Sequence, residues 1–421
     1  MIVSRLLFGD LHATILKRST VKFHRLVMLC LFPSFISTAF SQYDGSYPFN
    51  TPVDPRSAAM GESFVALPSD PAALMYNPAG LAGLNGLSVS YSRMSMDWFI
   101  QDWSVASVTA AAGTPFGVIA AQYNRKSMGK VAVTTVQYPG GTGSEISLYS
   151  YSLALGYSYR LPVGLALGIS AKYYDYLQTV SGPAPVGLPP WHTVPSYLFD
   201  FGLTYTLPRL HSQSTVEDSL TIGMCYQNIG TRWQVSIPLN TFDNSGATTT
   251  EYLVLPQYYR LGLSYAMRLR PTEEGGLSPF GATIAGEFRS LQSPLPTSYA
   301  VYSYSAPYPE TSYWGLGLEF TFYDIVSVRG GAAFRPYSDV EADRDRASFR
   351  YGACVCLPFR RIGIDLPLTF SFQYTVIPVS EPVTQYVFDQ PAGPGFFEDM
   401  GARTGTYPLL SLEIQYEGVP W

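Results

Sequence analysis

The feature that most constrains this chain is a sustained alternation of apolar residues with small or polar ones. The clearest stretch runs from Ile362 to Val376, where every second residue is apolar and those between are mostly Gly, Ser, Thr or Gln. A period of two residues is typical of a β-strand whose two faces meet different surroundings. The alternation therefore predicts strands with one apolar face.

About fourteen such segments follow one another from residue 86 onward. Strands of soluble proteins mostly have ~5–6 residues, whereas a tilted membrane strand needs ~9–11. The segments here reach about 10–16 residues, which favours strands that cross a membrane. They cover 86–95, 102–112, 115–125, 145–160, 163–177, 196–207, 218–229, 257–270, 279–290, 312–322, 325–336, 346–357, 361–376 and 405–417.

The connections between these segments alternate in length. Short ones include 113–114 and 323–324, and long ones include 178–195 and 230–256. Transmembrane barrels have short periplasmic turns and long outer loops. We therefore expect an all-β fold, a transmembrane antiparallel β-barrel of about 14 strands at residues 86–421, with both termini in the periplasm. The alternative, a soluble β-sandwich or propeller, does not predict this alternation of loop lengths.

The composition supports a membrane protein. Only 14% of the 421 residues are charged and 47% are hydrophobic, whereas soluble domains carry about 25% charged residues. A charge that faces lipid near the membrane midplane costs ~2–4 kcal/mol. We therefore expect the strand charges to face the lumen, as salt bridges that fill the barrel or, alternatively, as a substrate site. The candidates are Lys172, Arg260, Arg268, Glu287, Glu319, Arg329 and Arg350.

Residues 1–41 have the pattern of a signal peptide. A basic region from Lys17 to Arg25 precedes an apolar run from Leu26 to Ile36, and small residues follow at Ala39 and Ser41. This pattern predicts export and cleavage, and with the barrel it places the protein in the outer membrane of a Gram-negative bacterium. Loss of five basic residues and one acidic residue takes the net charge from −5 to about −9, which argues against nucleic acid as a partner.

Residues 42–85 do not alternate and contain two helix starts. Asp70-Pro71 and Asn77-Pro78 each place a capping side chain before a proline at the first helical position. About forty mildly apolar residues must pack somewhere, and an empty barrel of this size would leak. We therefore expect 42–85 to form a short helical hatch, or plug, in the lumen. The alternative is a periplasmic extension below the barrel mouth.

This segment resembles the N-terminus of the PorV/PorQ family, outer-membrane barrels related to the FadL-type long-chain fatty-acid channels. Glycine-containing strand pieces such as Phe199–Tyr205 and Tyr259–Tyr265 fit the same family, whereas Glu62 replaces its usual small residue. The residues that carry the resemblance, the hatch motif, are Met60, Gly61, Phe64, Asp70, Asn77, Pro78, Gly80 and Leu81.

The resemblance implies a fourteen-stranded barrel with an N-terminal hatch. It also implies either an accessory role in type IX protein secretion or FadL-like uptake of hydrophobic molecules. The partners would be a secretion translocon or secreted cargo proteins in the first case and a hydrophobic small molecule in the second. Outer-membrane lipid surrounds the barrel in both.

An enzyme is not expected, because the chain has no G-x-S-x-G and only His192 and His211 follow the signal peptide. No cofactor or metal is expected either. A lateral opening would need a kinked strand, for which Pro367 is the candidate, although it could equally be a tolerated bulge. We favour a non-enzymatic accessory of type IX secretion that handles or anchors exported cargo. The alternative is a channel for hydrophobic small molecules such as long-chain fatty acids.

Overall fold

The chain divides into two compact units, Met1–Phe40 and Ser41–Trp421, and every residue described here belongs to the second. The predicted signal peptide and most of the long connections lie outside the described residues. The computed structural model describes residues 52–95, 103–132, 143–182, 191–192, 195–208, 215–230, 233–238, 248–253, 257–271, 275–291, 312–334, 347–387 and 396–417.

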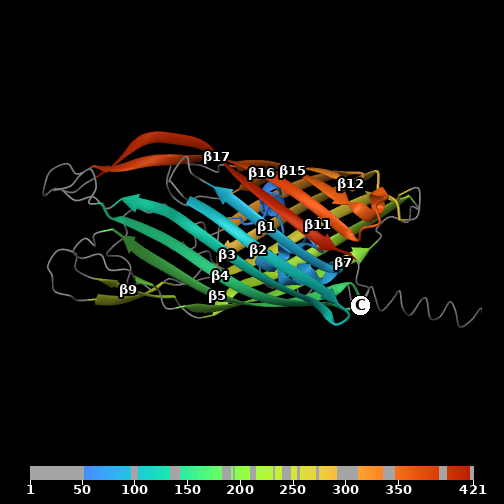
Figure 1. Ribbon diagram of the computed structural model, residues 1–421, viewed down its shortest axis with the longest axis horizontal. Coiled ribbons are helices and arrows are strands. Elements are labelled where there is room, and N and C mark those ends of the chain that lie inside the picture. Colours follow the sequence, from blue (N-terminus) through green and yellow to red (C-terminus); the bar gives the residue numbers. More distant parts are fainter. Residues whose placement is uncertain are drawn as a thin grey trace, which may run out of the picture. The chain divides into compact units, whose positions relative to one another are not determined.

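Fourteen antiparallel strands form a closed ring (Figure 1). Each pairs with its neighbour along the chain, and the last pairs with the first, so the ring has no free edge. The predicted barrel of about 14 strands is confirmed. The strands are β1 (Leu87–Ser95), β2 (Trp103–Thr114), β3 (Gly117–Ala132), β4 (Glu145–Arg160), β5 (Leu165–Ser181), β7 (Ser196–Pro208), β8 (Val216–Gly230), β11 (Tyr258–Leu269), β12 (Phe280–Leu291), β13 (Ser312–Phe322), β14 (Val326–Phe334), β15 (Ala347–Pro358), β16 (Leu368–Val387) and β17 (Phe396–Tyr416).

Three short strands lie outside this ring order. The two-residue β6 (Trp191–His192) pairs with β5. The strands β9 (Trp233–Pro238) and β10 (Thr248–Leu253) form a separate hairpin in the connection between β8 and β11.

The alternation along each strand separates the outer surface of the ring from its interior. On β13 the outward Trp314 is 56% exposed and the neighbouring inward Tyr313 is 1% exposed. The same strand exposes Leu316, Leu318 and Phe320, whereas Glu319 is buried. An apolar outer face with charges turned inward is that of a transmembrane barrel. Among the described residues, no helix combines the length and apolarity needed to span a membrane.

Residues 52–86, which we call the luminal segment, lie inside the ring as three short helices (blue in Figure 1). They are α3 (Pro55–Ala59), α4 (Ala73–Tyr76) and the 3₁₀ helix η2 (Pro78–Gly83). Asp54 caps α3 by accepting from the Ser57 amide, and Asn77 caps η2 by accepting from the Ala79 amide. Asp70 accepts from the Ala72 amide at 2.9 Å, one residue before α4 begins.

The hydrophobic core lies where the luminal segment meets the barrel wall. Met60, Phe64, Leu74 and Leu81 of the segment are fully buried. They pack with small wall residues of β2, β3 and β4, because a small wall side chain leaves room for a large one from inside. These wall residues are Ala111, Ala120 and Ala154.

Pro367 does not interrupt a strand, so the predicted strand kink there is wrong. The strand predicted from residue 361 begins at Leu368, after a turn made by the 3₁₀ helix η4 (Phe359–Ile362) and the left-handed Gly363. Ile362, Ile364 and Leu366 are exposed around this turn. The apolar alternation of the sequence therefore continues beyond the end of the strand. A proline before the first strand residue removes no hydrogen bond from the ladder.

The wall departs from regular pairing elsewhere. Between β7 and β8 the register shifts between Phe199 and Phe201. Asn228 adopts a left-handed conformation beside this shift, and its amide donates to Asp200 at 2.9 Å. A polar contact therefore holds the irregularity together from the inside.

Candidate functional site

The candidate site is the interface between the luminal segment and the inward face of the barrel. All eight residues of the predicted hatch motif lie on the luminal segment, and most are buried in it. Asn77 shows how the motif works, since its side-chain amide donates to Val65 O at 2.7 Å and to Leu203 O at 3.2 Å. The first bond braces the segment internally, and the second ties it to β7.

Inward-facing glycines let the segment lie directly on the strands. A Cβ atom added at Gly317 of β13 would come within 3 Å of the Met60 backbone, and one added at Gly331 of β14 would come equally close to Met60 and Gly61. On the opposite side, one added at Gly168 of β5 would come equally close to Ala79. These three glycines are therefore places where two backbones meet, a role that strand periodicity does not reveal.

Glu62 is buried and paired with two arginines of the wall. Its carboxylate accepts from Arg350 Nη1 at 2.6 Å and lies 3.6 Å from Arg289 Nη1. Arg289 also lies over the rings of Tyr258 and Tyr313, at 5.0 and 4.5 Å from their centroids. Glu62, which departs from a family pattern, is thus a main polar contact between segment and wall, and we call this contact the first junction.

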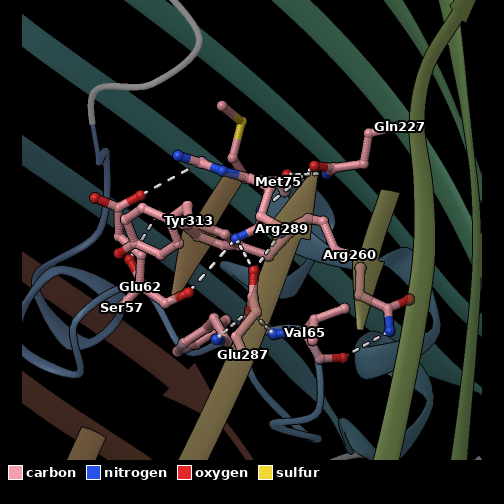
Figure 2. Close-up of polar contacts among 12 residues, drawn as sticks. Ser57, Glu62, Val65, Met75, Gln227, Arg260, Glu287, Arg289 and Tyr313 are labelled. Atoms are coloured by element: carbon pink, nitrogen blue, oxygen red, sulfur yellow. Dashed lines mark hydrogen bonds and ion pairs between the residues drawn. The ribbon is translucent and has the colours of Figure 1, made fainter. Parts of the chain in front are cut away.

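Glu287 of β12 forms a second junction, from the wall toward the segment. One carboxylate oxygen accepts from the amides of Phe64 and Val65, both at 2.8 Å, and the other pairs with Arg260 at 2.5 Å. The Arg260 guanidinium lies 4.9 Å from the centroid of the Tyr76 ring. Figure 2 shows Arg260 of β11 and Arg289 of β12 beside Glu62 of the segment and Glu287 of β12.

Arg56 forms the third junction. It donates to Asp70 at 2.9 Å within the segment and to Glu319 of β13 at 2.8 Å. Glu319 also pairs with Arg329 at 3.4 Å, and Arg329 donates to Gln373 at 2.5 Å. The motif residue Asp70 therefore caps a turn and also helps to position the arginine that reaches the wall.

Two of the candidate luminal charges lie apart from these junctions. Lys172 is buried and pairs with Asp200 at 2.6 Å, next to the β7–β8 irregularity. Arg268 is 42% exposed and pairs with Asp324 in the turn between β13 and β14. The structure therefore brings Arg260, Glu287, Glu319, Arg329 and Arg350 into contact with the segment or its partners, and places Arg268 at the rim.

Asp54 is a titratable group on the luminal segment, outside the membrane-spanning strands. Burial and the nearby Asp70 carboxylate raise the pKa of Asp54 to about 7. A carboxyl that stays protonated near neutral pH avoids the cost of a buried, partly compensated charge. The first cap of the luminal segment is therefore sensitive to pH.

Two small cavities of about 20 Å³ each lie beside Met75 of the segment. Each has room for one or two water molecules, so neither is a passage. Both are lined by Met75 and Lys172. The first also has Glu62, Gln227, Arg260 and Arg289 in its wall, and the second has Gln122, Asn124, Lys126, Ser150, Ser152 and Tyr174.

Chemically, this interface can hold a segment in one position inside a barrel. Paired charges, backbone amides and tight backbone contacts determine where the segment lies against the barrel wall. Within the described part of the chain, no group of three or more His, Cys, Asp or Glu side chains is arranged to hold a metal.

No protein-family model matches the sequence, and no curated protein is significantly similar to it. The PorV/PorQ resemblance therefore has no support from either comparison.

Three solved structures have a similar arrangement of strands. A Pseudomonas aeruginosa FadL homologue is 12% identical with a TM-score of 0.48, over 87% of this chain and 99% of that one. The Ralstonia pickettii toluene transporter TbuX is 14% identical with a TM-score of 0.44, over 87% and 100%. The Pseudomonas putida toluene transporter TodX is 11% identical with a TM-score of 0.43, over 90% and 100%. Similarity at these identities and TM-scores does not establish a family for the chain.

Proposed function

We propose that this protein is a non-enzymatic channel for hydrophobic small molecules in the bacterial outer membrane, closed by its own luminal segment. The observation that carries the proposal is that residues 52–86 fill a closed barrel and meet its wall through buried ion pairs. A segment held this way is suited to be a gate.

The outer surface and the N-terminal sequence support the location. Large apolar side chains are exposed around the ring, whereas the strand charges of the three junctions are buried inside. This arrangement stabilises a barrel in lipid and would aggregate in water. The pattern of a signal peptide at residues 1–41 agrees with export, and the alternation of connection lengths favours periplasmic termini.

The chemistry of the interface supports movement of the segment. A buried ion pair contributes little net stability, because desolvation offsets most of the attraction. The three junctions therefore fix the position of the segment but add little to the free energy that holds it in the barrel.

The size of the free space favours small molecules over polypeptides. The cavities beside Met75 hold about 20 Å³ each, so a modest shift of the segment would admit a small molecule. An extended polypeptide would require that the whole segment leave. The secretion-accessory interpretation rests on the PorV/PorQ resemblance, which neither comparison of sequences supports, so it has less support.

The experiment is to lock the segment to the wall and measure uptake. Ser264 Oγ lies 2.8 Å from Ala66 O, so A66C and S264C place two thiols within reach of a short cleavable thiol cross-linker. The free cysteines Cys225, Cys354 and Cys356 are first replaced by serine. We expect cells that carry the cross-linked protein to lose uptake of toluene or decanoate, and cleavage of the linker to restore it.

Single-cysteine variants treated with the same reagent serve as controls and should retain uptake. Uptake that persists through the cross-linked barrel would contradict a gate at residues 52–86. Purification in mild detergent addresses the other interpretation, since a stable complex with a translocon or secreted cargo, together with no uptake, would favour the secretion accessory.

A further inference from the structure

The outer surface of the barrel changes from aromatic to basic on β1 and β3, which lie on either side of β2 (Figure 1). On β1 the outward Tyr91 is 47% exposed, and the next outward residue is the exposed Arg93. On β3 the outward Tyr123 is 40% exposed, and the next outward residue is the exposed Arg125. Both strands therefore pass from a tyrosine to an arginine on the face that meets lipid.

The strand register places these two arginines in one row across the wall. Arg93 pairs with Ala106 of β2, and Ala106 pairs with Arg125. Because neighbouring strands lie ~4.8 Å apart, the Cα atoms of the two arginines are ~10 Å apart. Only the methyl group of Ala106 stands between them, so both guanidinium groups can converge on one ligand.

The next row toward the strand ends consists of three serines. Ser95 of β1 pairs with Ser104 of β2, and Ser104 pairs with Ser127 of β3. A serine hydroxyl can both donate and accept hydrogen bonds. The arginine row therefore has an aromatic, apolar surface on one side and hydroxyl groups on the other.

The charge of the two arginines is not balanced within their row. Among the described residues, neither of them forms an ion pair. Arg125 lies over the Tyr149 ring, 5.4 Å from its centroid. Farther along the row, Asp175 accepts from Tyr151 at 3.0 Å. Two arginines and one carboxylate that is already bonded leave this part of the surface positive.

The height of the row matches the edge of the membrane. Arg125 lies eight residues beyond Gly117, where β3 begins after the short turn from β2. At ~3.3 Å per residue and a tilt of ~45°, the row is ~19 Å above that turn, toward the top of an apolar band ~25 Å tall. Tyr91 and Tyr123 lie one row nearer the centre, as in the aromatic girdle of a transmembrane barrel. A long arginine side chain at this level reaches the lipid headgroups.

We propose that Arg93 and Arg125 bind a phosphate of lipid A, the phosphorylated glycolipid in the outer leaflet of Gram-negative outer membranes. The row lies at the end of the barrel with the long connections, which we expect to face outward. Arginine forms bidentate, charge-assisted hydrogen bonds with phosphate, so the two guanidinium groups hold the phosphate above Ala106. The Ser104 hydroxyl is a further donor, and the acyl chains lie along the apolar rows. This inference concerns the outer surface of the barrel and does not depend on what passes through the lumen.

The test is native mass spectrometry of the full-length, delipidated protein in a neutral detergent, titrated with lipid A. The comparison lipids are lipid A without its phosphates and phosphatidylglycerol. We expect lipid A to bind at least tenfold more tightly than either, because its phosphomonoester carries a charge of about −1.5 to −2 near neutral pH. The double variant R93Q/R125Q should lower lipid A affinity at least tenfold, whereas R93K/R125K should retain part of it.

The matched control is R360Q, which removes an exposed arginine from η4 at the opposite end of the barrel. Its affinity for lipid A should equal that of the wild type. Folding of each variant is checked by the heat-dependent gel mobility of the barrel. Phosphate-free lipid A or phosphatidylglycerol that binds as tightly as lipid A, or a folded R93Q/R125Q protein with full affinity, would each overturn the proposal.

Discussion

Glu62 lies at the centre of the contact between the luminal segment and the wall. Its carboxylate is buried between Arg350 and Arg289, and its backbone is left-handed, with φ of 60°. The residue next to it, Gly61, is left-handed as well. The chain therefore turns sharply at this point and directs the carboxylate toward the wall.

Replacing Glu62 with Gln should loosen the luminal segment. Removal of one partner of a buried ion pair leaves the other charge uncompensated, at a cost of about 3–5 kcal/mol. We expect faster hydrogen exchange across residues 52–86, measured by mass spectrometry, in a barrel that remains folded.

The control is E217Q, which removes a carboxylate from an exposed pair with Arg270. An exposed pair contributes ~0–1 kcal/mol, so exchange of the segment should not change. Equal protection in E62Q and the wild type would mean that the arginines find other partners and that Glu62 does not position the segment.

Asp54 should make docking of the segment depend on pH. Its pKa is raised from 3.8 to about 7, so the docked state retains the proton to higher pH than the released state. The contribution of Asp54 is then fully present below about pH 4 and is lost as the pH rises through about 7. We expect protection of α3, corrected for the intrinsic rate of exchange, to fall across this range.

D54N keeps an effective helix cap and removes the titration. If Asp54 is responsible, the pH dependence between about 4 and 7 should weaken in this variant. A wild-type protein with constant protection over the same range would show that Asp54 titrates normally.

At the scale of the elements, the strands form a wall in which inward-facing glycines leave room for the luminal segment. Gly331 and Gly330 are neighbours on β14 and point in opposite directions. A Cβ added at Gly331 would come within 3 Å of the Gly61 and Met60 backbone, whereas one added at Gly330 would find its nearest atom at 4.0 Å. Two adjacent glycines therefore have different roles, and only one of them touches the segment.

G331A should displace the luminal segment, and G330A should not. Forcing an extra methyl group into a close contact costs about 1–3 kcal/mol, and the cost at Gly331 falls on the contact with Met60 and Gly61. We expect G331A to increase hydrogen exchange in residues 52–86 and to leave the heat-dependent mobility of the barrel unchanged. The same exchange pattern in both variants would show that neither glycine is needed for close approach.

At the scale of the whole barrel, closure and filling depend on each other. The pairing of β17 with β1 removes all free strand edges from the ring, and the luminal segment supplies the core that the inward faces lack. Without the segment, the interior would be a polar tube lined by buried charges such as Arg350 and Glu287. Water would then enter and screen those charges.

Deletion of residues 52–84 should therefore give a folded barrel that conducts ions. Single-channel recording in planar bilayers should show steady conductance for the deletion variant and little for the intact protein. Heat-dependent gel mobility verifies that the variant folds. A folded variant without conductance would mean that something other than the luminal segment closes the lumen.

The limits of prediction are clearest where local periodicity ends. The strands and their two faces follow from alternation, and the cap of η2 at Asn77 follows from neighbouring residues. The cap predicted at Asp70 is wrong, because Asp70 closes a turn at Ala72 and α4 begins only at Ala73, without a side-chain cap.

The sequence predicts a strand at Pro367 because apolar residues alternate on both sides of the turn at Gly363, and periodicity does not distinguish an exposed turn from a strand. Glu62 and Arg350 are 288 residues apart, so no local pattern pairs them.

By itself, therefore, the sequence determined a transmembrane barrel of about fourteen strands with charges turned away from lipid, because each strand's period of two reflects its own two environments. Only the tertiary structure decided which charges meet the luminal segment and which glycines it lies against. Those contacts depend on how a closed ring aligns strands that are far apart in the chain. That alignment is a property of the whole barrel, and the sequence of a single strand does not determine it.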